Sequence, residues 1–234
     1  MGDLHGRSQA LKEVLDRSGF DLKNDKLILL GDIADGGPDT RECVEILLKV
    51  KNLVFVYGNH DCEWTRAFLV QNQDPGRIWK GQGGMATLES YGFKPSDPEE
   101  PEDCLWVGPE IPEDHKQFWN SGVYWHEENN MLFVHGGINP LSPVDMQTPR
   151  NLMWDRSMAL NVIQCRGHIY EKYAGVTRWD HIFLGHTAIG DPWLPVTSGR
   201  ITVIDTGAGH CGKLTLMNIH TKQFWQSEKT DPAF

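Results

Sequence analysis

The sequence predicts an α/β protein whose strands lie parallel in a central sheet. Two observations support this prediction. Strand-sized apolar runs alternate with amphipathic helical segments, and the runs end in glycine-containing turns that bear Asp, Asn or His. The chain of 234 residues has the length of one large domain and can bury a sizeable core. We therefore expect a single domain over residues 1–234.

The beginning of the chain predicts a strand, helix and strand in succession, after a first helix. Ser8 can cap that helix and Gly19 can end it. The apolar run 26–30 reads as a buried strand, Pro38 begins a second helix, and residues 53–60 repeat the pattern of a strand followed by a turn. This order implies right-handed crossovers between parallel strands. The inner face of the second helix is expected to carry Cys43, Val44, Leu47 and Leu48.

The stretch 62–130 interrupts this alternation of strands and helices. It is expected to be helical and loop-like, with an exposed loop over residues 94–103, and to form a cap or wall beside a site. Its aromatic residues, Trp64 among them, are expected to pack mainly in a core, with a minority available to line a substrate wall. The strand-then-turn pattern returns at residues 131–137, 182–186 and 201–207, and residues 213–219 are expected to pair with the last of these as a hairpin.

The charge balance excludes some partners. Lys and Arg total 22 against 32 Asp and Glu, a net charge of −10, and no basic stripe is present, so a nucleic-acid duplex is not an expected partner. An acidic chain can still bind phosphate, because bound divalent cations invert the local charge. The five scattered cysteines indicate neither a disulfide framework nor a cysteine zinc site, which favours a reducing, cytoplasmic setting. No apolar run approaches the length of a membrane helix, so no membrane partner is expected.

Oxygen and imidazole donors follow the predicted strands. Residues at the carboxyl ends of neighbouring strands meet in one crevice. The donor set lacks thiolates, which suits Mn, Fe or Zn and argues against a structural zinc site. Six candidate ligands exceed the three protein ligands of a single catalytic zinc, so two ions that share a carboxylate are expected, with Asp32 as the bridge. The candidates are Asp3, His5, Asp32, Asn59, His135 and His186.

Two such ions have a defined chemistry. Placed about 3.5 to 4 Å apart, they would acidify a bridging water to hydroxide and neutralise phosphoryl oxygens during an in-line displacement. No covalent enzyme intermediate is needed. The sequence contains no GxSxG-like elbow that would favour a serine nucleophile, and Cys62 has no evident activating context.

Five short motifs resemble one known family. GDLHG, GDIAD, GNHD, HGG and GHT occur in this order between Gly2 and Thr187, and together they resemble the calcineurin-like metallophosphoesterases. Within that family the likeness is greatest to the bacterial and bacteriophage lambda type of serine/threonine protein phosphatase, which residues 83–92 and 204–212 also resemble. The resemblance implies a four-layer α/β fold, with a central β-sandwich of two mixed sheets flanked by helices.

The resemblance also implies roles for single residues. His60 would protonate the leaving oxygen, oriented by Asp35, and Arg156 would grip phosphate oxygens as a fork, with Asn59 as a further phosphate contact. Of the two divalent ions, manganese is expected first, with iron or zinc as alternatives. One ion would be held by Asp3, His5 and Asp32, and the other by Asp32, Asn59, His135 and His186.

Two positions depart from the family pattern. The family usually carries a second phosphate-gripping arginine where this chain has Gly36, and losing one charge-assisted contact costs about 1.5 to 3 kcal/mol unless it is replaced. Arg7 or Arg41 could replace it, although both are expected on helix surfaces. In addition, only Met1 and Gly2 precede Asp3, so the first strand of the sheet is expected to be absent from this chain.

The expected function is metal-dependent hydrolysis of a phosphoester. The substrate would be a phosphoprotein or a small phosphomonoester, as for a serine/threonine protein phosphatase. The alternative is a hydrolase of diadenosine polyphosphates or other nucleotides, for which an aromatic wall could stack a base. A binding module without activity would be expected to have lost His60 or a ligand, and none is lost. The sequence does not indicate an oligomeric state.

Overall fold

The larger sheet of the molecule is five-stranded and mixed. The computed structural model describes residues 1–164 and 178–232. In this sheet the strand order is β5-β6-β7-β9-β8, with β6, β7 and β9 parallel and the outer two strands antiparallel to their neighbours. The strands are β5 (Trp125–Glu128), β6 (Met131–Val134), β7 (His181–Leu184), β8 (Val196–Ser198) and β9 (Ile201–Val203).

The second layer of strands consists of two short sheets. β1 (Lys26–Leu29) and β2 (Asn52–Phe55) are parallel, as predicted, whereas β10 (Thr215–Met217) and β11 (Phe224–Gln226) form an antiparallel pair. The predicted pairing of residues 213–219 with residues 201–207 is therefore wrong, apart from a single bridge between Gly207 and Lys213. An alternating apolar run marks a strand but does not identify its partner.

Met1 and Gly2 join the two short sheets. The carbonyl of Met1 accepts a hydrogen bond from the amide of Leu30 (3.0 Å), and the amide of Gly2 donates to the carbonyl of Thr215 (3.1 Å). Within the described ranges no strand is assigned before the first helix. These two residues thus occupy one rung of a strand position between β1 and β10.

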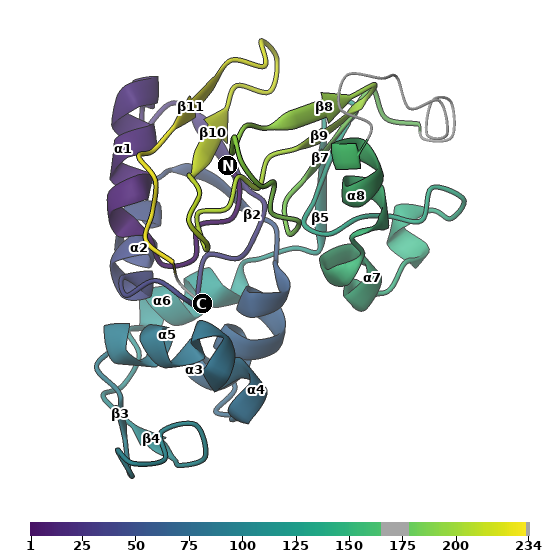
Figure 1. The fold of residues 1–234 in the computed structure, drawn as a ribbon. Helices are drawn as coiled ribbons and strands as arrows, with labels where there is room; N and C mark the ends of the chain where they lie inside the picture. Colours follow the sequence, from purple (N-terminus) through teal and green to yellow (C-terminus); the bar gives the residue numbers. More distant parts are fainter. Residues whose placement is uncertain (165–177, 233–234) are drawn as a thin grey trace.

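Helices cover both outer faces of the sandwich (Figure 1). α1 (Ser8–Ser18) and α2 (Thr40–Leu47) lie against the β1–β2 and β10–β11 side, and α7 (Pro149–Trp154) and α8 (Ser157–Gln164) lie by the five-stranded sheet. Gly19 ends α1 in the left-handed conformation, as predicted. Two details differ: Ser8 is the first helical residue and its hydroxyl donates to Asp39, and Leu48 is exposed rather than buried.

The stretch 62–130 is divided between two locations. Its helices and a small hairpin gather beneath the sandwich in Figure 1, whereas β5 returns to the five-stranded sheet. β5 was missed because its sequence Trp-His-Glu-Glu shows no apolar alternation. The elements beneath the sandwich are the π-helical turns His60–Thr65 and Lys80–Gly84, α3 (Arg66–Leu69), α4 (Arg77–Trp79), α5 (Met85–Ser90), β3 (Lys94–Pro95), β4 (Trp106–Val107) and α6 (Glu113–Asn120).

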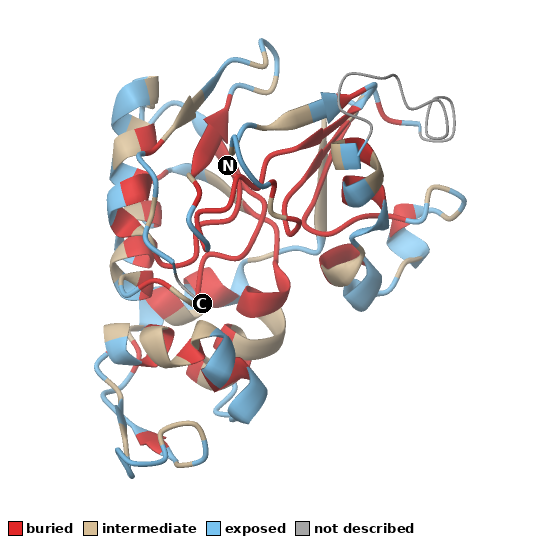
Figure 2. Cartoon of the chain, in the orientation of Figure 1, coloured by how far each residue is buried: buried red, intermediate tan, exposed pale blue. Residues whose placement is uncertain are grey.

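Three buried apolar clusters account for the layering (Figure 2). Ile28, Phe133 and Phe183 belong to the cluster between the two layers of strands, and the rings of Phe133 and Phe183 stack at 5.0 Å. The other two clusters lie between each layer of strands and its helices. Burial on both faces explains why β1, β6 and β7 are nearly continuous apolar runs.

The layering sets the place of the polar turns. β1, β2, β6 and β7 end at the same edge of the sandwich, and each is followed by a short turn that carries Asp, Asn or His. Among the described residues no helix is long and apolar enough to cross a bilayer.

His181, at the start of β7, predicts an acid-sensitive contribution to stability. Burial lowers its pKa to about 4, with Lys222 contributing. The unfolded chain binds this proton near the ordinary pKa of about 6.5, so folding stability falls as the pH drops from about 6.5 to about 4. We expect His181→Gln to reduce that fall, by at most about 1.4 kcal/mol per pH unit. Urea unfolding at several pH values measures it, with exposed His220→Gln as the control. Equal slopes in His181→Gln and the parent chain would contradict this assignment.

Candidate metal centre

The polar turns bring the six predicted ligands together at the carboxyl edge of the sandwich. Nε2 of His135 lies 3.3 Å from Oδ2 of Asp32, and Nε2 of His5 lies 3.8 Å from the same oxygen. Two groups of side chains form around that carboxylate, and in each group the ligand atoms lie within 4.8 Å of one another. One group is Asp3, His5 and Asp32, and the other is Asp32, His135 and His186.

Hydrogen bonds on the far side of each imidazole fix how it faces this centre. Nδ1 of His135 donates to the carbonyl of Leu30 at 2.5 Å, and Nδ1 of His5 contacts the carbonyl of Asp35 at 3.1 Å. Each ring therefore presents Nε2 to the Asp32 carboxylate. Bonds of this kind set the tautomer and orientation of metal-binding histidines.

Several buried polar atoms around Asp32 lack a hydrogen-bond partner in the described structure. An unpaired buried group of this kind usually costs about 1 to 3 kcal/mol, so four of them in one place need a common explanation. All four are oxygen or imidazole nitrogen atoms of the kind that binds Mn, Fe or Zn. The residues present thus fit a pair of divalent ions. The atoms are Asp3 Oδ1, Asn59 Oδ1, His186 Nε2 and His135 Nε2, of which the last lies 3.3 Å from Oδ2 of Asp32 without the geometry of a hydrogen bond.

The backbone holds these side chains in an uncommon conformation. His5, Asp32 and His186 have φ values of 48°, 48° and 61°, in the left-handed region that non-glycine residues rarely adopt. Two glycines make room: a Cβ on Gly58 would lie 2.0 Å from Oδ1 of Asp32, and one on Gly185 would lie 2.5 Å from Oδ1 of Asp3. Short turns with local strain therefore aim the candidate ligands.

The buried carboxylates and imidazoles of the centre shift one another's pKa values. Burial raises the pKa of Asp3 well above its usual value, and the nearby carboxylate of Asp205 adds to the effect. Burial also acts on His135, but Asp32 and Asp3 outweigh it and raise its pKa to about 10. Burial lowers the pKa of His186 to about 3, so this imidazole is neutral, as a metal ligand must be.

His60 and Asp35 form a buried pair beside the two groups. Nδ1 of His60 lies 2.8 Å from Oδ2 of Asp35, which has no exposed surface. Trp79 and Thr87 donate to the two carboxylate oxygens at 2.9 and 2.8 Å. Burial opposes protonation of His60, but Asp32 and the bond to Asp35 raise its pKa. The bond to Asp35 thereby helps to fix the imidazole in position.

A cavity of about 300 Å³ opens over the centre. Arg156 lines it and donates from Nη1 to the carbonyl of His186. Gly36 does not line it, and neither Arg7 nor Arg41 does: Arg7 donates to the carbonyl of Asp231, and Arg41 bonds Glu45 on the surface of α2. Of the nine predicted site residues, seven line the cavity, while Asp35 and His135 lie buried beside it.

Asp61 was not singled out from the sequence. Its Oδ1 accepts from the amide of Ile33 (2.8 Å) and its Oδ2 from the amide of Gly58 (3.0 Å), so this carboxylate ties the turn after β1 to the turn after β2. Burial raises its pKa to about 7, with Asp32 contributing. Its position in the sequence, directly after Asn59 and His60, was the feature that could have indicated a place near the centre.

Further cavity residues also escaped the sequence prediction. Gln82 belongs to the π-helical turn of the 62–130 stretch, and Asp205 and His210 come from the segment after β9. Asp205 is buried, and its Oδ1 accepts from the amide of Gly207 at 3.0 Å. His210 likewise lines the cavity. The segment 204–212 resembled the family, but no spacing rule indicated which of its side chains face the site.

The fold and the donor set define a metal-dependent hydrolase of phosphoesters. The sequence profile of the family described as calcineurin-like phosphoesterase matches residues 1–190, and the chain belongs to that family. Metallophosphoesterases of this kind bind two divalent metal ions, in agreement with the two ions expected from the sequence. The predicted family and fold class are thereby confirmed.

Three curated relatives differ in their named substrates. A symmetrical bis(5'-nucleosyl)-tetraphosphatase of Pseudomonas fluorescens is 31% identical over 60% of this chain and 42% of its own length. The corresponding protein of Haemophilus ducreyi is 23% identical over 98% of this chain and 97% of its own. Serine/threonine-protein phosphatase 1 of Salmonella typhimurium is 25% identical over 94% of this chain and 90% of its own length.

A solved structure shares the fold. It is of a protein proposed to be a diadenosine tetraphosphatase, and the likeness covers 98% of this chain and 91% of the other, with a TM-score of 0.62 and 18% identity. At this identity the likeness extends to the arrangement of the chain and no further.

The shared position of Asp32 predicts that its replacement removes metal. We expect Asp32→Asn to bind less than one equivalent of Mn²⁺ per chain, against two for the parent, and to lose at least about a hundredfold in turnover. Elemental analysis after dialysis measures the metal, and circular dichroism checks folding. Asp97→Asn in the exposed acidic loop is the matched control. Two retained equivalents in folded Asp32→Asn would refute the shared-carboxylate arrangement.

Proposed function

We propose that the chain hydrolyses dinucleoside polyphosphates or closely related nucleotide substrates at a pair of divalent ions. A water oxygen bonds to a phosphorus atom and the water loses a proton, one P–O bond breaks, and the oxygen of the leaving nucleotide takes up a proton. The support comes from the centre around Asp32, from a ledge of aromatic side chains beside it, and from the names of two relatives. Manganese as the preferred ion, a cytoplasmic location and a single domain over residues 1–234 are parts of the same proposal.

The candidate ligands would hold the ions in two sets. Asp3, His5 and Asp32 would bind one, and Asp32, Asn59, His135 and His186 the other. Bound there, the ions supply a water of lowered pKa and neutralise charge on the phosphoryl group. The unpaired buried atoms of Asp3, Asn59, His135 and His186 support this assignment.

His60 would protonate the leaving oxygen. Its Nδ1 is held by Asp35 at 2.8 Å, and its side chain lines the cavity in which a substrate would lie. The neighbouring rings restrict its rotation, since Trp64 lies edge-on at 4.6 Å and His5 at 5.1 Å between centroids. A positioned imidazole of raised pKa suits a general acid.

Arg156 would bind the phosphate with Asn59. The guanidinium has five N–H donors, and Nη1 donates to the carbonyl of His186. Among the described residues no other hydrogen bond of this guanidinium is found, so further donors can reach oxygens in the cavity that Arg156 lines. Because Gly36 carries no side chain, this is the arginine we assign to phosphate. His210 and Gln82 line the same cavity.

The observation that favours a nucleotide is an aromatic and cationic ledge, defined as Trp64, Trp154 and Arg150. Trp154 lies edge-on to His186 at 5.9 Å and to Trp64 at 5.9 Å, so the ledge begins at the candidate ligands. Both tryptophans are half-buried, and the guanidinium of exposed Arg150 lies 5.7 Å from the Trp154 ring. Base stacking on such side chains contributes about 1 to 3 kcal/mol per base.

A serine/threonine phosphatase is the second candidate. It was the first expectation from the sequence, and the Salmonella typhimurium relative covers nearly the whole chain. An open cavity accepts a phosphorylated side chain as well as a polyphosphate. The two candidates differ in whether Trp154 contributes to substrate binding, because a phosphopeptide has no base to stack.

Trp154 therefore separates the candidates. On Mn²⁺-loaded protein we expect kcat/KM to be highest for diadenosine tetraphosphate among that substrate, a phosphothreonine peptide and an aryl phosphate. Trp154→Ala should lower the dinucleotide value about 5- to 160-fold, corresponding to about 1 to 3 kcal/mol, and leave the aryl phosphate value within about twofold. Phe224→Ala, an exposed aromatic residue on β11, is the control. Highest activity on the phosphopeptide, with no effect of Trp154→Ala, would overturn the nucleotide assignment in favour of the second candidate.

Variants of Arg156 separate the effect of its positive charge from the effect of its forked shape on phosphate binding. Arg156→Lys keeps a cation but loses the fork that matches phosphate oxygens, so we expect kcat/KM to fall at least about tenfold for every substrate. In Arg156→Ala the value of kcat/KM should fall further, by an amount that corresponds to about 1.5 to 3 kcal/mol or more. Steady-state kinetics and metal content are measured together. Full activity of Arg156→Ala with two bound ions would exclude the assigned role.

A further inference from the structure

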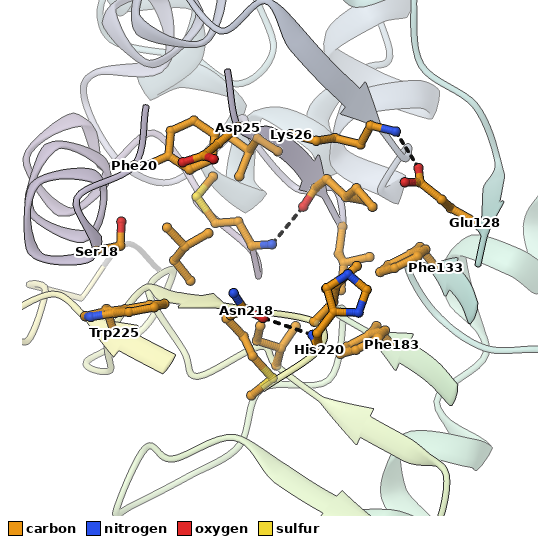
Figure 3. A pocket seen from close by; sticks show the side chains of 18 residues that line it. Ser18, Phe20, Asp25, Lys26, Glu128, Phe133, Phe183, Asn218, His220 and Trp225 are labelled. Atoms are coloured by element: carbon orange, nitrogen blue, oxygen red, sulfur yellow. Dashed lines mark hydrogen bonds and ion pairs between the residues drawn. The ribbon is translucent and has the colours of Figure 1, made fainter. Parts of the chain in front are cut away.

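A pocket of about 490 Å³ adjoins the cavity over the candidate metal centre. It lies between the π-helical turn Lys80–Gly84, α5 and the β3–β4 hairpin, and we call it the outer pocket. The two spaces share one lining residue, Gly81. By contrast, the cavity shown in Figure 3, which Phe133 and Phe183 line from the five-stranded sheet, shares no lining residue with the cavity over the centre. The outer pocket is therefore the space that a ligand at the centre reaches by crossing a single residue.

Gly81 has no conformational reason to be a glycine. Gly36 and Gly83, which also line the outer pocket, have φ values of 94° and 91°, in the left-handed region that favours glycine. Gly81 is not among the residues of positive φ, and a Cβ at this position would meet only the carboxylate group of Glu102 within 4 Å, at 3.5 Å or more. A larger residue would fit the backbone here. The missing side chain instead leaves open the position at which the two spaces meet.

The turn between the two spaces is fixed relative to the metal centre. Nε1 of Trp79, directly before the turn, donates to Oδ2 of Asp35 at 2.9 Å, and the hydroxyl of Thr87 on α5 donates to Oδ1 at 2.8 Å. Within the turn, the carbonyl of Gly83 accepts from the amide of Gly36 at 3.1 Å. The outer pocket therefore keeps one position beside the centre, as a specific binding site requires.

The lining of the outer pocket suits a neutral group better than a phosphate. Prolines of the β3–β4 hairpin and Trp106 line one side, and Met85 lines the other from α5. Lys80 is the only cation among the lining residues, and it is 2% exposed, with its ammonium bonded to Asp74 at 2.8 Å and to the carbonyl of Cys104 at 2.9 Å. Apolar walls with few polar groups are typical of small-molecule sites of about 300 to 1,000 Å³.

Glu89 supplies a polar group to this lining. Its side chain is exposed on α5, and no hydrogen bond or ion pair of its carboxylate is found among the described residues. A carboxylate accepts hydrogen bonds from the exocyclic amino group of a base such as adenine. The nearby carboxylates of Glu102 and Asp103 are already paired with Arg77, at 3.0 and 3.1 Å. A single unpaired carboxylate in an apolar pocket fits a base better than it fits a polycationic peptide.

We propose that the outer pocket binds the second nucleoside of a dinucleoside polyphosphate. One base stacks on the ledge, the phosphate chain lies over the metal centre and crosses Gly81, and the second base donates to Glu89 in the outer pocket. The ledge and the outer pocket adjoin the centre through different residues, since Trp154 contacts His186 whereas the outer pocket begins at Gly81. This inference rests on the proposed function and narrows it: the preferred substrate carries a nucleoside at both ends.

The kinetic test compares diadenosine tetraphosphate with adenosine 5'-tetraphosphate, which lacks the second nucleoside. On the Mn²⁺-loaded parent chain we expect kcat/KM to be at least about fivefold higher for the dinucleotide, the lower limit for one stacked base. Gly81→Leu and Ala86→Leu, which fill the crossing and the outer pocket, should each remove this preference. Gly190→Leu is the matched control, because Gly190 is exposed, has no positive φ and has open space around its Cβ. Circular dichroism checks the folding of each variant.

A binding measurement locates the second nucleoside without turnover. Adenosine, titrated into the chain loaded with diamagnetic Zn²⁺, should shift the methyl NMR signals of Met85 and Ala86 in a saturable way. Glu89→Ala should weaken this binding, and Glu99→Ala, in the exposed loop and outside the lining, should not. The ledge does not affect this readout, because both methyl groups belong to the outer pocket.

The outcomes separate the outer pocket from the proposed function. An unchanged substrate preference in folded Gly81→Leu and Ala86→Leu, or no shift of the Met85 and Ala86 methyl signals at millimolar adenosine, overturns the nucleoside site. A loss in these variants that is confined to a phosphothreonine peptide assigns the outer pocket to a peptide and also overturns it. If the parent chain hydrolyses neither nucleotide, the proposed function fails, and the adenosine titration alone then decides whether the outer pocket binds a nucleoside.

Discussion

The close approach of buried donors to the Asp32 carboxylate is the constraint on which the rest of the structure depends. Two imidazoles face one of its oxygens, and the amide of His60 donates to the other at 3.1 Å. Such a concentration of polar atoms would destabilise an ordinary core. This concentration of polar atoms explains the left-handed turn conformations, the presence of Gly58 and Gly185, and the additional carboxylate of Asp61. All three features hold the turns in place relative to one another.

Much of this arrangement could be predicted from the sequence, because the candidate ligands occupy turns directly after strands. A strand-then-turn pattern fixes which residue reaches the sheet edge, so Asp32, Asn59 and His135 could be placed without coordinates. Sequence could not show which buried carboxylate joins two turns, as Asp61 does, because that depends on distances between segments. It also could not show which side chains of residues 204–212 face the cavity.

The strands were predicted less well where apolar patterning is weak. β5 has four half-buried residues and two carboxylates, and β8 has only three residues, so neither produces the alternation that marks a strand. The mispaired β10 illustrates a different limit. Its run of three buried residues was recognised, but β11 is short and partly exposed, and the choice of partner is a tertiary property.

The hydrogen bond between His186 and Asp3 has a consequence for how the protein is synthesised. The amide of His186 donates to Oδ2 of Asp3 at 2.9 Å, across a separation of 183 residues. Closing so long a loop is slow relative to local contacts. On a ribosome, the amino-terminal ligands emerge first and must wait until most of the chain has been synthesised before their partners exist. Assembly of the centre is therefore a late step, and a nascent chain holds exposed carboxylates that only the finished molecule can enclose.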